Sequence, residues 1–115
     1  PIMETLIRIS NSKDFQKHPN VSHNILMVSD MIQHSDNWTH YPGRDQGANW
    51  SRFSSEMNGT VYMSPRLNQV QVQVFYAKRQ NQRDKSIQTR SHAQFWEEFF
   101  FNAGANLSGW INIDG

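Results

Sequence analysis

Apolar and polar positions follow two distinct rhythms along the chain. A spacing of three and four residues, typical of a helix with one buried face, occurs in residues 1–11, 48–57 and 88–103. A period of two, typical of a strand, occurs in residues 69–77, and residues 107–113 carry a further strand-like apolar run. Residues 24–29 are almost continuously apolar, which suits a strand covered on both faces. The pattern therefore predicts the order helix, strand, helix, strand, helix, strand.

This alternation predicts an α/β fold with a mainly parallel sheet. Parallel neighbours are joined by right-handed crossovers that carry a helix, so helices are expected to enclose the sheet in a three-layer sandwich. Gly104 follows the last predicted helix, at the position where a left-handed C-terminal cap belongs. Residues 31–47 are expected to form a long loop, and such loops are usually functional or disordered. Residues 78–85 are expected to be a solvated charged loop, with phosphate contact as the alternative.

Composition and charge narrow the class of protein. The 115 residues suffice for one domain with a buried core. The absence of cysteine excludes disulfides, thiol nucleophiles and cysteine-ligated metal sites. A formal net charge of +1 argues against nucleic acid as a partner. No apolar run is long enough for this segment to insert into a membrane.

The chain begins inside a predicted helix. Pro1 suits a first helical position, and Ile2, Leu6 and Ile9 follow as an apolar stripe with no capping residue before them. We therefore expect residues 1–115 to be a single partial domain that lacks its N-terminal half, with removal of an initiator methionine as the alternative. Three strands leave one sheet edge open and apolar, so self-association or pairing with the missing half is expected.

Five stretches of the chain share a pattern with one protein family: residues 1–6 (PIMETL), 25–31 (ILMVSDM), 38–41 (WTHY), 70–72 (VQV) and 95–105 (FWEEFFFNAGA). Together they resemble the C-terminal half of a bacterial von Willebrand factor A-like domain. The resemblance implies a Rossmann-like, doubly wound α/β sandwich, which agrees with the predicted element order. Relatives of this type are often exported or membrane-tethered, so the resemblance also implies a periplasmic or membrane-tethered protein in a bacterium.

The same resemblance implies a divalent cation, Mg²⁺ or Ca²⁺, at the C-terminal strand ends of the complete domain. Its ligands come from an Asp-x-Ser-x-Ser loop, from a Thr or Ser just upstream of Pro1, and from a strand-ending Asp that Asp30 matches. This chain supplies one loop of the three, and a hard cation needs several converging oxygens, so no cofactor is expected in this fragment. The structural alternative for Asp30 is to cap backbone N–H groups of the following turn.

A second chemistry is suggested by His34, Asp36 and His40, which follow Asp30, with Asp45 beyond them. Imidazoles and carboxylates together could bind zinc or another transition metal, which makes a metal-dependent hydrolase the alternative function. The spacing of the two histidines matches no metal signature, however. Structural or solvated roles are therefore favoured for these residues.

Aromatic residues divide into two groups. Phe95, Trp96, Phe99 and Phe100 recur at helical spacing and are expected to be core. Trp38, Tyr41 and Trp50 lie in or beside the long loop, where they either form a recognition surface with His40 or fold the loop onto the domain.

These observations predict a non-catalytic protein-binding module of von Willebrand factor A-like type. Its partner is expected at the C-terminal ends of the strands, with Asp30 and residues 31–45 as one wall of the site. The alternatives are the metal-dependent hydrolase and a fragment without activity.

Overall fold

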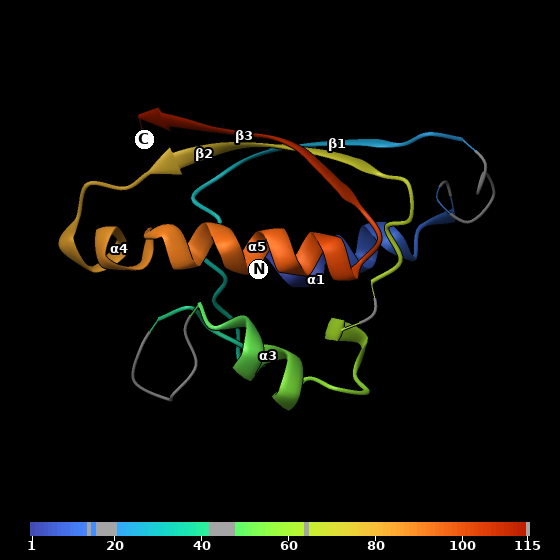
Figure 1. Cartoon of the computed structure of the whole chain (residues 1–115), viewed down its shortest axis with the longest axis horizontal. Helices are drawn as coiled ribbons and strands as arrows, with labels where there is room; N and C mark the ends of the chain where they lie inside the picture. Colours follow the sequence, from blue (N-terminus) through green and yellow to red (C-terminus); the bar gives the residue numbers. More distant parts are fainter. Residues whose placement is uncertain (14, 16–20, 42–47, 64, 115) are drawn as a thin grey trace.

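The computed structural model of the chain describes residues 1–13, 15, 21–41, 48–63 and 65–114. The elements run in the order α1 (Ile2–Ser10), β1 (Asn24–Ser29), α3 (Trp50–Glu56), η1 (Val61–Met63), β2 (Gln71–Lys78), α4 (Gln82–Ile87), α5 (Arg90–Asn102) and β3 (Asn106–Asp114) (Figure 1). The predicted α/β character is confirmed, and the six predicted elements lie within about two residues of their expected bounds. The prediction that residues 78–85 form a loop is wrong for the second half of this stretch, because α4 begins at Gln82.

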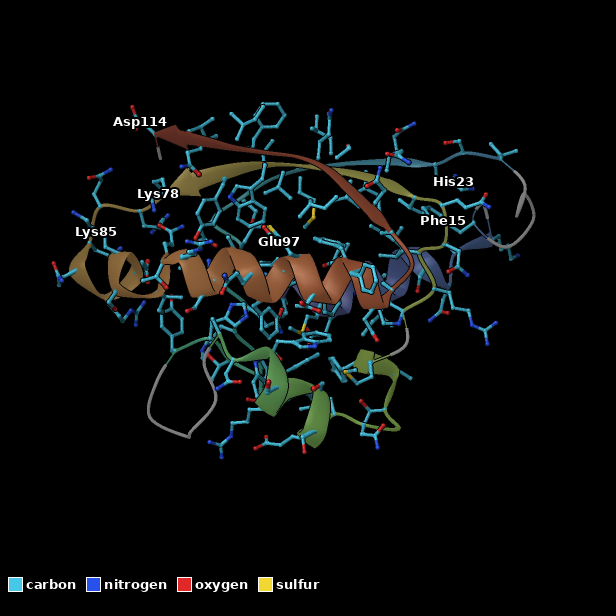
Figure 2. The ribbon with its side chains drawn as sticks, in the orientation of Figure 1. Phe15, His23, Lys78, Lys85, Glu97 and Asp114 are labelled. Atoms are coloured by element: carbon cyan, nitrogen blue, oxygen red, sulfur yellow. The ribbon has the colours of Figure 1, made fainter. Side chains whose placement is uncertain are left out.

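The three strands form one parallel sheet in the order β1-β2-β3. Val72 at the centre of the sheet lies between Ile25 of β1 and Leu107 of β3. One residue of β3 is extra opposite the Val72–Gln73 step, which shifts the register there. Lys78 and Asp114 are paired at the carboxyl ends of β2 and β3, and Figure 2 shows both side chains at that end of the sheet.

The core lies between the sheet and α5, which runs beneath the strands (Figure 1). The aromatic side chains of α5 expected in the core are all buried, namely Phe95, Trp96, Phe99 and Phe100. They form one core cluster with the inward side chains of β2, Val72, Val74 and Tyr76. Phe95 and Phe99 also contact the ring of Phe53 in α3, so the core extends beyond the space between α5 and the sheet. Removing a phenylalanine side chain from water stabilises the fold by roughly 2 kcal/mol, so this layer supplies much of the driving force for folding.

Among the described residues, all helices lie on one side of the sheet (Figure 1). The prediction that residues 24–29 are covered on both faces is therefore wrong for this chain. The side chains of Ile25 and Met27 pack on the core, while Leu26 and Val28 are 62% and 68% exposed. In Figure 1, α5 lies next to the sheet and α3 lies beyond α5, so the described helices are stacked on one side and the predicted sandwich of a sheet between helices is not formed. A whole face of the sheet is left open in addition to its edges.

The first part of the long loop is packed into the molecule. Residues 31–41, named here the hairpin, place Met31 and Trp38 fully inside the core. His34 and Thr39 face each other as an antiparallel bridge, and the indole of Trp38 packs edge-on against Phe53 of α3. Residues 31–45 were predicted to form one wall of the binding site. The structure describes this stretch only to residue 41, and Asp45 lies outside the described residues.

No helix within the described residues has both the length and the apolar character needed to cross a membrane.

Candidate functional site

A shallow groove of about 350 Å³ lies at the carboxyl end of β1. Its lining comes from three segments that are distant in sequence, and we call it the strand-end groove. The residues are Pro1, Ile2 and Thr5 at the start of α1, Met27, Ser29 and Asp30 at the end of β1, and Ile32 and His34 of the hairpin. Open α/β sheets bind ligands outside the carboxyl ends of their strands, which makes this groove the candidate site.

Backbone hydrogen bonds fix the turn that carries Asp30. The carboxylate Oδ1 of Asp30 accepts from the Ile32 N–H at 3.0 Å, and the Ser29 hydroxyl accepts from the Met31 N–H at 2.9 Å. These bonds hold Met31 at a φ of 57°, a left-handed conformation that is strained for a residue with a side chain. The predicted capping role of Asp30 is confirmed, because one of its oxygens is committed to the turn.

Two of the four residues expected at a recognition surface are buried. Trp38 is 0% exposed and His40 is 2% exposed, so the prediction that they present their side chains at the surface is wrong. Trp38 belongs to the same core cluster as Phe53, and His40 packs edge-on against Phe95 with ring centroids 4.6 Å apart. The alternative, that loop aromatics fold the loop onto the domain, describes both residues.

Tyr41 and Trp50 are half-buried and also have structural partners. The Tyr41 hydroxyl donates to Asp84 of α4 at 2.9 Å, and the Arg83 guanidinium lies 4.3 Å from the centre of its ring. Burial, together with the Asp84 carboxylate, raises the pKa of Tyr41. Trp50 packs on the rings of Phe53 and Phe95.

The basic residues of the 78–85 stretch gather around Asp84, which is 3% exposed. Arg79 and Arg83 approach its carboxylate at 3.3 and 3.5 Å, and the Asn81 amide donates to it at 2.9 Å. The hydrogen bond from the Asn81 amide is the main reason why the pKa of Asp84 is lowered. Two of the cations expected in a solvated loop are therefore engaged within the protein.

The four residues of the hydrolase alternative do not converge. His40 lies in the core, Asp36 is exposed, and His34 bonds to the Thr39 hydroxyl at 2.8 Å. Throughout the described part of the chain, no three His, Asp or Glu side chains are grouped so that they could hold a metal ion.

A buried polar network links Gln33 of the hairpin to α1, and the sequence pattern did not predict it. Gln33 is 0% exposed; its amide oxygen accepts from the Met3 N–H, and its amide nitrogen donates to Glu4, both at 2.9 Å. Burial by itself would raise the pKa of Glu4, but hydrogen bonds from Gln33, Ser35 and Tyr62 outweigh it and hold that pKa below its usual range. Because Gln33 stands in a polar run, no sequence signal distinguishes it from a surface glutamine.

Comparison of the chain with protein-family models, with curated proteins and with solved structures finds no match. Arguments about function therefore start from the geometry of this chain.

Proposed function

We propose that the chain is a non-catalytic protein-binding module built on a Rossmann-like fold of von Willebrand factor A-like type. The parallel order β1-β2-β3, with helical segments between successive strands, supports this fold. So does the strand-end groove, because Pro1 and Asp30 line it together. The resemblance implies that the segment preceding Pro1 and the strand-ending aspartate meet at one site.

The observation that carries the proposal is the uncovered face of the sheet, which we call the outer face. Val28, Phe75 and Ile111 are paired in register and form an apolar row across all three strands. Two of them, Val28 and Ile111, are 68% and 53% exposed. Parallel sheets are nearly always covered on both faces, and a contiguous exposed apolar patch marks a site of protein association.

The composition of the outer face suits burial against protein. Strand alternation and register assign it Asn24, Leu26, Val28, Gln71, Gln73, Phe75, Ala77, Asn106, Gly109, Ile111 and Ile113, none of which is charged. Covering it therefore requires no desolvation of an ion, which would cost several kcal/mol for each charge. In Figure 2, side chains stand on this face with no ribbon above them.

The exposed area of the molecule is also large for its mass. The chain exposes 7112 Å², whereas a compact monomer of this mass exposes roughly 6,500 Å². A second copy of the chain, paired through the outer face, would cover part of this area.

The strand-end groove is the proposed place for recognition of a further protein. Asp30 offers a carboxylate at its rim, and the hairpin residues Ile32 and His34 form one wall. As the described residues stand, they do not fit a divalent cation, because Asp30 is a lone carboxylate with one oxygen already bound to the Ile32 N–H. We therefore derive no role for a metal in binding by this chain.

The test is sedimentation velocity of the wild type and of two matched variants. Val28→Lys places a charge on the outer face, and Val61→Lys makes the same change at a 62% exposed valine in η1. The wild type and Val61→Lys should sediment as associated species whose mass rises with concentration. Val28→Lys should be monomeric, because association would bury its ammonium group.

Two results would contradict the proposal. One is a wild-type protein that stays monomeric and well behaved at every concentration reached. The other is an equal loss of association in Val28→Lys and Val61→Lys, since it would place the contact elsewhere. Circular dichroism of the three proteins checks that their secondary structure is the same.

A further inference from the structure

Two histidines meet inside the core, and the proposed function does not use them. His40 of the hairpin and His92 of α5 are 2% and 0% exposed. The Nε2 atom of His92 lies 3.2 Å from the Nδ1 atom of His40, and the rings are nearly perpendicular. The pair thus joins the hairpin to the helix that supports the sheet.

The hydrogen bonds around His40 specify where its proton lies. Its Nδ1 atom accepts from the backbone N–H of Gln33 at 3.0 Å, so the neutral ring carries its proton on Nε2. The backbone N–H of His40 in turn donates to the Gln33 carbonyl at 2.8 Å. These two bonds close the hairpin, and the first exists only while Nδ1 has a free lone pair.

The hydrogen bonds around His92 place its proton on Nε2, the atom that faces Nδ1 of His40. Its Nδ1 atom accepts from the Tyr76 hydroxyl at 2.5 Å, and its Nε2–H points at the Met31 carbonyl at 2.7 Å. The Trp96 indole donates to that same carbonyl at 2.7 Å. The Nδ1 atom of His40 therefore faces two N–H groups, one from Gln33 and one from His92.

A proton added to His40 has no place in this arrangement. It must bind at Nδ1, where it would face the N–H groups of Gln33 and His92 and remove the acceptor of the hairpin bond. A proton added to His92 is better tolerated, because the Tyr76 oxygen could accept from it. Even so, it would put a charge on a fully buried ring that packs against His40 and Tyr76.

The surrounding charges do not compensate a buried imidazolium. Tyr76 and Lys78 of β2 face His92 from the sheet, and Asp30 faces it from the end of β1. Asp30 favours a proton on His92, whereas Lys78 opposes it. In the described segments, no carboxylate is hydrogen-bonded to either ring. Burial lowers the pKa of His92 to about 4, and burial together with His92 holds the pKa of His40 well below its usual range.

We propose that His40 and His92 form an acid-operated latch, in which uptake of a proton by the pair releases the hairpin from the core while the sheet and α5 stay folded. Opening is favoured because an exposed histidine binds a proton near its ordinary pKa of about 6.5, whereas the closed form resists it. The closed form binds fewer protons, so its stability falls as the pH is lowered below that value. For each proton taken up on opening, the equilibrium constant for opening rises about tenfold for every unit by which the pH is lowered.

Opening has a consequence for the strand-end groove, and this consequence rests on the proposed function. Ile32 and His34 line the groove, so release of the hairpin removes one of its walls. A partner bound at the strand ends would then be released in acid. The latch itself is tested without any partner, so its failure is distinguishable from failure of the binding proposal.

The experiment is amide hydrogen exchange of the whole chain between about pH 7 and about pH 4, expressed as protection factors. In the wild type, protection at Gln33 and His40 should fall about tenfold per pH unit for each proton bound, while protection at Val72 and Val74 of β2 is retained. His40→Asn keeps an acceptor near Nδ1 that does not titrate in this range. This variant should lose the part of the pH dependence that comes from His40, so that protection of the hairpin falls by at most the tenfold per pH unit expected for one proton on His92.

His34→Asn is the matched control, because it removes an exposed histidine from the same hairpin. It should keep the wild-type pH dependence. An unchanged pH dependence in His40→Asn overturns the latch, as does simultaneous loss of protection in the hairpin and β2.

If His40→Asn does not fold, nitrogen NMR of the wild-type imidazoles decides instead. The two rings should become charged in the same pH step in which the hairpin loses protection. Charged rings inside a hairpin that remains protected would overturn the proposal.

Discussion

Gln33 has an uncharged amide side chain that lies wholly inside the molecule and joins the hairpin to α1. Its side chain bonds to the Met3 N–H and to Glu4 in α1, and its backbone bonds to His40 across the hairpin. A buried amide stabilises a fold only when all its groups have partners, and here both ends of the amide do. The role of this residue therefore depends on partners about 30 positions away in sequence, which no local pattern reveals.

Gln33→Ala should lower the free energy of unfolding by about 3 kcal/mol, because it leaves a cavity and strands the Met3 N–H without its acceptor. The measurement is urea denaturation at neutral pH. Gln94→Ala, at an exposed position of α5, is the matched control and should change stability by less than about 0.5 kcal/mol. Equal effects of the two substitutions would show that the Gln33 network contributes nothing to stability.

At the scale of elements, helix ends were decided by a few local residues. Gly104 has a φ of 81° and ends α5, as its place after the apolar stripe predicted. The prediction missed α4, although Asn81 caps it by accepting from the Asp84 N–H at 2.9 Å. The signal was present, since Asn three residues before an acidic residue is a typical start of a helix. The density of charge in that stretch led to the loop interpretation instead.

Gly104→Ala should destabilise the protein by about 1–2 kcal/mol, because a residue with a side chain is strained in the left-handed region. A Cβ atom there would also lie 2.2 Å from the Asn68 side-chain oxygen, so that side chain must turn away. Thermal unfolding compared with Gly59→Ala separates the two effects. Gly59 has the same φ of 81° with no atom within 4 Å of the added Cβ, so its substitution should cost less.

At the scale of the whole molecule, the important feature is that one face of a parallel sheet has no cover among the described residues. The elements that build this sheet were predictable, because α5 and β2 show their periods plainly in the sequence. Which face they would cover was not predictable. The continuous apolar run of β1 is compatible with helices on both sides, and in this chain Leu26 and Val28 are exposed.

The effect of salt on association should show whether apolar contacts or charged pairs hold the outer face against its partner. Because the face carries no charged side chain, sodium chloride should leave the association constant nearly unchanged, and sulfate should raise it by strengthening apolar burial. Sedimentation velocity in the two salts measures this. Dissociation on adding sodium chloride would mean that charged pairs, rather than the apolar row, hold the copies together.

The sequence by itself determined the positions and types of the main elements, the parallel arrangement and the aromatic core stripe of α5. These depend on periodicity, chain breaks and caps, which are local properties of the chain. The tertiary structure alone decided that Trp38 and His40 are buried, that Gln33 is a buried link, and that the helices leave one sheet face open. Burial is set by contacts between residues far apart in sequence, so identical local patterns can end in the core or at the surface.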